Sequence, residues 1–322
     1  MIITVTPNTA LDVTYEVDEL RPYQSHRVKA VHHRAGGKGI NVASVLTLMG
    51  HEVVAMGLTG GTTGAQIQAD LEMRGVGHCL IDCDGDSRRT INVVSARHGD
   101  ATIFNEPGPQ VSSAHWRELM ENLVALVDAT ATTVVVLSGS LPRGVEPGLY
   151  GRLIEEMKRL GVLTVLDSEG EPMNIATRKG PDIVTPNELE AEGLVGHEFS
   201  DEEDRRTAIG EMVELGAREA IMTLADGCLA MLVEGGERRL FRATLEPLEP
   251  VSSVGSGDAF LAGFVAARYG ERDIDDCLRF AVACGAESTQ HFGAGRVEQR
   301  EVERLVPDVR VEQLETPALT VG

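Results

Sequence analysis

Residues 254–264 read VGSGDAFLAGF, in which two glycines and a carboxylate directly precede an apolar pattern of helical period. Phe260 and Phe264 are four residues apart and therefore share one face of the predicted helix. Small residues at a helix N-terminus leave backbone N–H groups accessible, and these groups together with the helix dipole favour an anion. Beside such an anion hole, Asp258 is placed to accept a proton from an attacking hydroxyl. The competing interpretation is a tight glycine turn with Asp258 as the helix N-cap.

The rest of the chain alternates short apolar runs with longer helical patterns, which is typical of parallel βαβ units. Strands are predicted at residues 2–6, 53–58, 133–138, 163–167, 183–185 and 220–223. Helices are predicted at residues 41–49, 64–74, 113–127, 148–160 and 205–215. The expected fold class is therefore α/β, with a largely parallel sheet.

Two segments, residues 12–31 and 89–104, interrupt this alternation. They look like alternating strands joined by polar turns, with no helix between them. Antiparallel strands inserted in a parallel α/β chain predict a separate small sheet, a candidate lid whose exposed edges could also pair with a second copy. Residues after Pro307 are predicted to form a loosely attached tail.

The chain is acidic, but its charge is unevenly distributed. It has 322 residues, with 29 Lys+Arg against 50 Asp+Glu, a net charge of −21. This excludes nucleic acid and anionic membranes as non-specific partners. Between Arg21 and His51, however, there is no Asp or Glu, and we call residues 21–51 the basic segment; its cations are Arg21, Arg27, Lys29, Arg34 and Lys38.

Two features bear on the compartment. No apolar run approaches the length that a bilayer requires, and the N-terminus does not resemble a signal peptide. The five cysteines are scattered without the spacing of a zinc or redox motif, so we expect reduced and mostly buried thiols. A cytoplasmic protein is expected.

Two further glycine-containing stretches are candidates for ligand binding. In residues 35–43, AGGKGINVA, the glycines allow close approach of the backbone to a ligand, and Lys38 and Asn41 supply charge and an amide. The alternative is a flexible turn before a helix capped near Asn41. Residues 138–144, SGSLPRG, directly follow a predicted strand, where ligands of α/β sheets bind, although a plain strand-to-helix loop explains them equally well.

A fourth stretch, residues 185–190 with the sequence TPNELE, offers oxygen donors. Asn187 and Glu190 are three residues apart, so at a helix start both could face hydrated magnesium. An N-cap asparagine followed by an acidic residue at the third helical position also matches a capping box, and this interpretation is favoured by the pattern alone.

Taken together, these stretches resemble the PfkB (ribokinase-like) family of sugar kinases. The match runs from residues 6–12, TPNTALD, through the GSGD stretch and the helix after it, nearly the whole chain. GGKGINVA, SGSLP and NEPGP at residues 105–109 resemble the phosphosugar branch, most closely the bacterial 1-phosphofructokinases and then the tagatose-6-phosphate kinases. The resemblance implies one Rossmann-like kinase domain over residues 1–322. Its β lid would be formed by about residues 12–34 and 88–106, and would pair with a second lid in a homodimer.

The resemblance also implies roles for individual residues. Asp258 matches the catalytic base, beside an anion hole of Gly255, Ser256 and Gly257. ATP contacts are implied for Asn187, Thr223, Gly227, Gly255 and Gly257, and association with Mg²⁺ for Asn187 and Glu190. The sugar-phosphate positions are Asp12, Arg27, Gly37, Lys38, Gly39, Asn41, Arg89 and Ser138, and a slip of one residue at Arg27 or Arg89 is allowed for.

The implied activity is ATP-dependent phosphorylation of a ketose monophosphate, first of all D-fructose 1-phosphate to D-fructose 1,6-bisphosphate. Tagatose 6-phosphate and fructose 6-phosphate are alternative acceptors, and a non-catalytic sugar-phosphate sensor is the alternative outside catalysis. Magnesium is expected as cofactor, and a requirement for K⁺ is left open. The sequence departs from the family pattern at two places that concern nucleotide binding. Thr185 replaces a lysine common in relatives, and the nucleotide loop is shortened to residues 223–227.

Overall fold

The centre of the computed structural model, which describes residues 1–95, 97 and 101–316, is a ten-stranded mixed sheet with the order β14-β13-β12-β11-β10-β9-β8-β1-β4-β5. Seven neighbouring strands are parallel: β1 (Ile2–Thr6), β4 (Val53–Thr59), β5 (Gly77–Asp82), β8 (Val134–Ser138), β9 (Leu163–Asp167), β10 (Ile183–Val184) and β11 (Glu219–Leu224). Three antiparallel strands extend the sheet beyond β11: β12 (Gly227–Glu234), β13 (Glu237–Thr244) and β14 (Arg310–Leu314).

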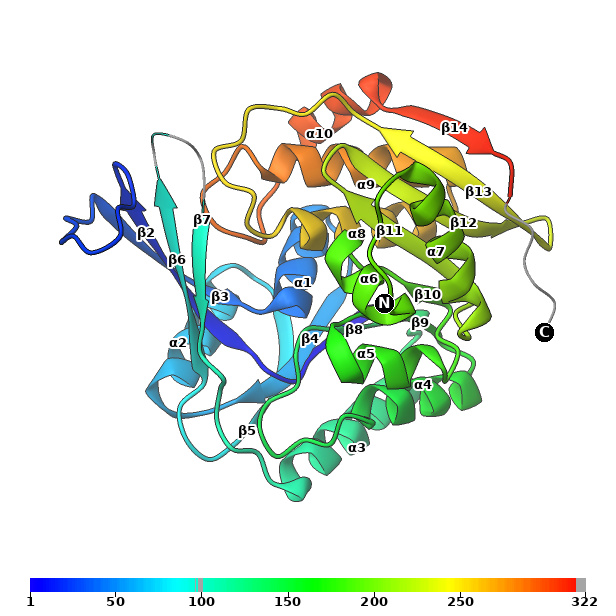
Figure 1. Cartoon of the computed structure of the whole chain (residues 1–322). Coiled ribbons are helices and arrows are strands. Elements are labelled where there is room, and N and C mark those ends of the chain that lie inside the picture. Colours follow the sequence, from blue (N-terminus) through cyan, green and yellow to red (C-terminus); the bar gives the residue numbers. More distant parts are fainter. Residues whose placement is uncertain (96, 98–100, 317–322) are drawn as a thin grey trace.

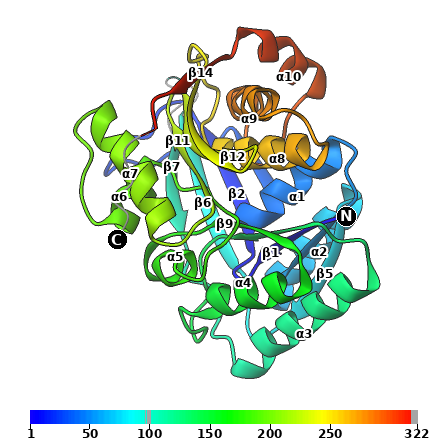
Figure 2. The ribbon, with the colours of Figure 1, turned by 90° about the vertical axis from the view of Figure 1, so that its right-hand side faces the viewer.

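Helices cover both faces of this sheet (Figures 1 and 2). One face carries α1 (Lys38–Leu48), α2 (Gly61–Met73), α8 (Ser256–Tyr269), α9 (Ile274–Ser288) and α10 (Gln299–Leu305). The other carries α3 (Ser113–Ala129), α4 (Leu149–Leu160), α5 (Gly170–Thr177), α6 (Glu188–Val195) and α7 (Glu202–Glu214).

The strands bury both faces because their side chains alternate between two hydrophobic cores. In β1, Ile2 packs into the core beneath α1 and α8, and Ile3 packs into the core beneath α3 and α4. Such strands are continuously apolar, which is why all six predicted strands are present. The predicted α/β class is confirmed.

A second, four-stranded sheet has the order β3-β2-β6-β7 (Figure 1, left). Its strands are β2 (Ala10–Val17), β3 (Ala30–Gly36), β6 (Arg88–Ser95) and β7 (Ala101–Asn105). The two outer pairs are antiparallel, as expected, but the central pair, β2 and β6, is parallel. Both central strands leave the large sheet in the same direction, so the small sheet continues from it without a reversal.

The expectation of a loosely attached tail after Pro307 is wrong for the described residues. A short 3₁₀ helix (Val306–Asp308) leads into β14, which pairs antiparallel with β13 at the edge of the large sheet. Val309 is buried, and its carbonyl accepts a hydrogen bond from Arg279 of α9. The polar sequence of β14 hides this pairing because an edge strand needs few apolar residues. Residues 317–322 lie outside the described residues.

All five cysteines are free thiols, and four of them are buried: Cys83, Cys228, Cys277 and Cys284. Among the helices of the described chain, none combines the length and the apolar character that crossing a membrane would require.

Candidate active site

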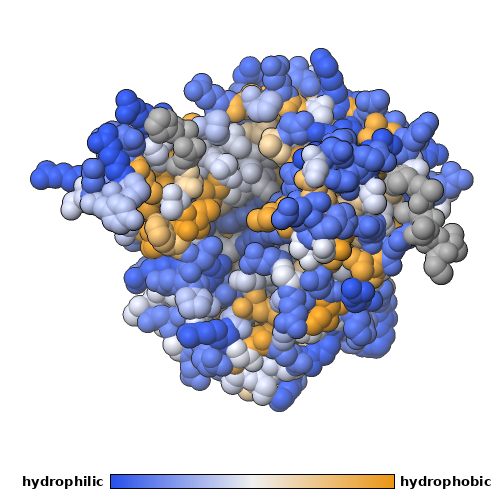
Figure 3. All heavy atoms as spheres, viewed as in Figure 1, coloured by the Kyte–Doolittle hydropathy of each residue, from blue (hydrophilic) through white to orange (hydrophobic). Residues whose placement is uncertain are grey.

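Parallel strands β1, β8, β9, β10 and β11 end at one edge of the large sheet, and three cavities that share lining residues lie there. Their volumes are about 640, 360 and 470 Å³. The first and second share Asn187, Thr223 and the start of α8, and the second and third share Lys38. Figure 3 shows the hollowed surface between the small sheet and the body of the molecule. We call these three cavities, in that order, the nucleotide cleft, the central cavity and the phosphosugar cavity. Thr223 and Gly227, two of the expected ATP contacts, line the first, whereas of the expected sugar-phosphate residues only Lys38 lines the third.

Helix α8 aims its first turn into the central cavity. Its N-cap is Gly255 in a left-handed conformation (φ 82°), where an added Cβ would lie 2.3 Å from the Cβ of Ala294. Both the left-handed backbone and the lack of space for a Cβ restrict this position to glycine. Asp258 is the third residue of the helix and makes no capping bond, so the N-cap interpretation is wrong. The amides of Gly257 and Asp258 have no intrahelical acceptor and can serve an anion in the cavity that these residues line.

Asp258 is held in an environment that favours its protonated form. Its Oδ2 accepts a hydrogen bond of 2.8 Å from Nδ2 of Asn41 on α1, which favours the charged form, but burial outweighs this effect. Burial raises the pKa of Asp258 to about 7, and the charge of Asp167 acts in the same direction. A carboxyl group that ionises near neutral pH can both accept and return a proton. The alternative interpretation of Asn41 as a helix cap is wrong, because α1 already begins at Lys38.

Lys38 is the cation at the centre of the site. Its Nζ lies 2.9 Å from Oδ1 of Asp167 and 2.8 Å from Oε1 of Glu190. Burial alone would lower the pKa of this amine, but the two carboxylates raise it above the ordinary value. Lys38 lines both the central and the phosphosugar cavity, and among the described residues that line the central cavity it is the one basic side chain.

The glycines around Lys38 allow close contacts between elements. A Cβ at Gly36 would lie 2.2 Å from the carboxyl carbon of Asp12, and a Cβ at Gly39 would lie 2.4 Å from Oγ1 of Thr6. Gly37 caps α1 with φ 103°, a left-handed conformation that favours glycine. Asp12 can therefore sit directly beneath the turn, where burial raises its pKa to about 6 against the charge of Arg88.

The phosphosugar cavity contains two arginines, Arg88 and Arg143. Arg88 Nε donates to the carbonyl of Asn8 (3.2 Å), and Arg143 Nη2 donates to the carbonyl of Gly108 (3.0 Å). Two positioned guanidinium groups are suited to a phosphate. Arg143 ends the stretch SGSLPR, and no pattern in that stretch distinguishes it as a ligand contact.

Arg89, which we expected at the sugar phosphate, is exposed on the opposite face of the small sheet. Side chains alternate along β6, so Arg88 shares a face with Thr90, which pairs with Asp12. A period-two count from Asp12 and Thr90 would have selected Arg88.

Two other predicted contacts lie away from the cavities. Arg27 is exposed in the loop between β2 and β3. Ser138 is fully buried and donates to Oδ2 of Asp167 (2.8 Å), so it positions Asp167 and cannot reach a sugar in this structure. Its neighbour Ser140 lines the phosphosugar cavity instead.

The basic segment is not a single site. Arg21 and Lys29 pair with Glu19 and Asp18 at the tip of the small sheet. Arg34 is partly buried and donates to the carbonyl of Ala294. Of the five cations, only Lys38 lines a cavity of the site.

Asn187 and Glu190 form the capping box that the pattern favoured. Oδ1 of Asn187 accepts from the Glu190 amide, and Oε2 of Glu190 accepts from the Asn187 amide, both at 2.9 Å. The other carboxylate oxygen of Glu190 accepts from Lys38. With its oxygens so engaged, Glu190 fits a magnesium ion that keeps its water shell. Within the described ranges, no three His, Cys, Asp or Glu side chains form a cluster that could hold a metal directly.

The nucleotide cleft is an apolar slot beside α8. Thr223 and Gly227, for which the resemblance implies ATP contacts, line it together with Leu248, Phe260 and Val282. The shortened loop is a tight turn from β11 to β12, in which Leu224 pairs with Gly227. Thr185, at the position where relatives commonly have lysine, is buried and lines the central cavity. The ammonium group that lines this cavity belongs to Lys38 instead.

Known proteins similar to this chain are carbohydrate kinases. The family model for pfkB family carbohydrate kinases matches residues 4–300. The 1-phosphofructokinase of Xanthomonas campestris pv. campestris is 32% identical over 312 residues, covering 95% of this chain and 94% of that protein. A tagatose-6-phosphate kinase of Staphylococcus epidermidis is 26% identical and covers 97% of this chain and 99% of its own. The crystal structure of phosphofructokinase-2 from Escherichia coli in complex with potassium has a TM-score of 0.85 at 25% identity, covering 95% of this chain and 98% of that one.

The buried Asp258 carboxylate should lower the stability of the fold at high pH. Its pKa rises from 3.8 in the unfolded chain to about 7 in the folded protein, so the folded state binds the proton more tightly. The stability that protonation contributes is therefore lost as the pH rises through 7. Asp258→Asn, which has no charge to bury, should exceed the wild type in free energy of unfolding by about 2–4 kcal/mol at pH 8, and the difference should vanish near pH 4. Urea unfolding across this pH range measures it; a difference that is constant with pH would contradict the assignment.

Proposed function

The chain belongs to the pfkB family of carbohydrate kinases, and on this premise we propose that it transfers the γ-phosphoryl group of ATP to D-fructose 1-phosphate, forming D-fructose 1,6-bisphosphate. The observation that carries the proposal is the row of three cavities with Asp258 in the middle one. With ATP in the apolar cleft on one side and the sugar phosphate in the two-arginine cavity on the other, the reacting groups would meet at Asp258.

In the proposed reaction, Asp258 removes the proton from the acceptor hydroxyl as the oxygen attacks the γ-phosphorus. The O–H bond breaks, an O–P bond forms, and the bond from the γ-phosphorus to the bridging oxygen breaks, so that ADP leaves with the electron pair. The amides of Gly257 and Asp258 stabilise the charge on the transferred group, since they are already oriented before the reaction. Lys38 lies between the two phosphate-binding regions and adds a positive charge there.

Magnesium bound with ATP supplies positive charge at the nucleotide phosphates, and Asn187 and Glu190 are the residues that would hold its water shell.

We include K⁺ in the proposal because the similar E. coli enzyme structure is a complex with potassium. Next to the start of α8, Val251 and Ser252 both donate their amides to the carbonyl of Thr289. These hydrogen bonds bring two loop segments together, and backbone carbonyl oxygens such as theirs are suitable ligands for K⁺.

The phosphate already on the sugar is assigned to Arg88 and Arg143. The acceptor hydroxyl must then lie at the other end of the sugar, toward Asp258, with Asp12 and Asn41 alongside. Tagatose 6-phosphate and fructose 6-phosphate make the same demand for a distal anion site, so they remain the alternative acceptors. A sugar-phosphate sensor would have no use for a buried carboxylate with a pKa near 7.

The small sheet is proposed to act as a lid and as a dimer contact. Its face toward the cleft carries Asp12 and Ile103, and Ile103 lines the central cavity. On the opposite face, Val31 and Phe104 expose half or more of their surface. Figure 3 shows apolar surface over this part of the molecule. The edge strands β3 and β7 each pair on one side only within the described chain, and their free outer edges suit association with a second lid.

Loss of the proposed base should abolish turnover but leave binding intact. Wild-type protein should show the highest kcat/KM for fructose 1-phosphate among the three ketose monophosphates, by about tenfold, which is about 1.4 kcal/mol in transition-state binding. Asp258→Asn should lower kcat by at least about a hundredfold, with the Kd for ATP changed little. Steady-state kinetics and calorimetry test this. Near-normal turnover in the variant would disprove the role of Asp258, and a different preferred acceptor would disprove the substrate.

Adjacent arginines on β6 provide a matched test of the phosphosugar cavity. Arg88→Met should raise KM for fructose 1-phosphate by about tenfold or more, because a hydrogen bond to a charged group contributes about 1.5–3 kcal/mol. KM for ATP should change little. Arg89→Met, one residue further and on the opposite face, should leave both constants near wild type. Equal effects of the two substitutions would contradict the assignment.

Phe104→Asp tests the dimer. If two lids associate through their apolar faces, a charge at this position should convert the protein from dimer to monomer in light scattering coupled to size-exclusion chromatography. Met73→Asp places the same charge on another exposed apolar residue, at the end of α2, and should leave the dimer intact. A wild-type monomer at micromolar concentration would refute the proposal.

A further inference from the structure

We propose that Arg205 and Arg242 are positioning residues that neutralise the acidic rim of the nucleotide cleft from behind, so that the cleft accepts a polyanionic nucleotide. The inference rests on the proposed function, because it takes the cleft to be the ATP site. Neither arginine lines the cleft, and neither stands in a motif on which the resemblance depends.

The cleft has the wrong charge for its proposed ligand. Its lining includes the carboxylates of Glu188, Asp226 and Glu246, and among its described lining residues there is no lysine or arginine. ATP carries several negative charges, and bare carboxylates at the rim would repel it. Some other part of the chain must compensate this charge.

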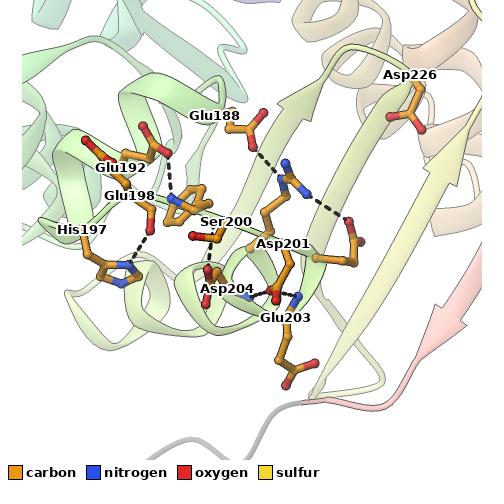
Figure 4. A network of polar contacts seen from close by, with 12 residues as sticks. Glu188, Glu192, His197, Glu198, Ser200, Asp201, Glu203, Asp204 and Asp226 are labelled. Atoms are coloured by element: carbon orange, nitrogen blue, oxygen red, sulfur yellow. Dashed lines mark hydrogen bonds and ion pairs between the residues drawn. The ribbon is translucent and has the colours of Figure 1, made fainter.

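A chain of ion pairs supplies the compensation, and we call it the rim ion-pair chain. Arg205 Nε lies 2.6 Å from Oε1 of Glu188, and its Nη1 lies 3.7 Å from Oε2 of Glu202. The other oxygen of Glu202 lies 3.5 Å from Nε of Arg242. Arg242 Nη2 in turn contacts both oxygens of Asp226, at 2.6 and 2.7 Å. Three side chains, Arg205, Glu202 and Arg242, thus connect Glu188 to Asp226, and Figure 4 labels these two ends of the chain.

The placement of the arginines separates them from the ligand. Glu188 begins α6 and Asp226 lies in the β11–β12 turn, so the two acids reach the cleft from different elements. Arg205 lies on α7 and Arg242 on β13, which are behind that rim. Arg242 is mostly buried and also donates to the carbonyls of Cys228 and Ala243, which fixes its guanidinium group. Glu188 and Asp226 are therefore each paired with a guanidinium group, and held in position by it, before a nucleotide enters.

The adjacent pair on α7 provides a control. Arg206, the next residue, contacts Glu203 and the carbonyl of Glu315, and neither of these lines the cleft. Substitution of Arg205 or Arg206 removes one positive charge from the same helix and the same net charge from the protein. Only the first substitution leaves a cleft carboxylate without its partner.

The test compares Arg205→Met, Arg206→Met and the double variant Glu188→Gln/Arg205→Met at low ionic strength. Arg205→Met should raise the Kd and KM for ATP by about three- to tenfold, with KM for fructose 1-phosphate unchanged. The double variant should restore ATP binding to near the wild-type value, because the uncompensated charge has been removed. Arg206→Met should resemble wild type, and salt should reduce the Arg205→Met defect.

Two results would overturn the inference: an ATP affinity of Arg205→Met equal to wild type, or a defect that Glu188→Gln does not relieve, which would indicate a structural role. Failure of the proposed function is distinguishable from either. In that case wild-type protein would show no ATP-dependent phosphorylation of any ketose monophosphate, whereas calorimetry with ATP would still report whether the rim ion-pair chain governs nucleotide affinity.

Discussion

A single buried hydrogen bond, from Asn41 Nδ2 to Asp258 Oδ2, joins the two helices on which the candidate site is built. It requires the N-terminal turns of α1 and α8 to meet above the carboxyl ends of the parallel strands. Glycines make that approach possible: a side chain at Gly39 would strike Thr6, one at Gly255 would strike Ala294, and one at Gly263 would lie 2.7 Å from the sulfur of Cys284. Helix packing, strand order and the position of the carboxylate are thus one constraint.

This convergence gathers like charges that the fold must tolerate. Asp167 lies near Asp258 and raises its pKa, and Glu190 adds a third carboxylate around the central cavity. Lys38 contacts two of these acids and opposes the charge on the third, so the cluster is held together by one ammonium group. Buried charges that are only partly compensated lower the stability of the fold. The same environment raises the pKa of Asp258, so that its carboxylate can take up a proton at neutral pH. Stability and chemistry are therefore coupled through Lys38.

The sequence predicts the parallel core well because buried strands are continuously apolar, as β1 and β9 show by matching their predicted ends. It also places the motifs correctly at helix starts. Prediction from sequence fails where the position of a residue depends on the direction of its side chain or on a partner distant in the sequence. Arg88 and Arg89 differ only in which face of β6 they occupy, and Ser138 is turned inward to Asp167 by contacts from another strand. Strand β14 depends on pairing with β13, a contact that no local pattern encodes.

The distribution of cations explains why total charge could not locate the site. The phosphosugar cavity has two arginines, the central cavity has Lys38, and the nucleotide cleft has no basic lining residue within the described chain. The basic segment contributes only Lys38, since its other cations pair at the lid tip, remain exposed or lie outside the cavities. A ligand phosphate fixed to the sugar thus meets permanent protein charge. In the proposed reaction the nucleotide instead relies on backbone amides, on the metal that it brings, and on a rim where Glu188 and Asp226 are already paired with arginines. An acidic protein can bind two anions in this way because each is neutralised by a different means.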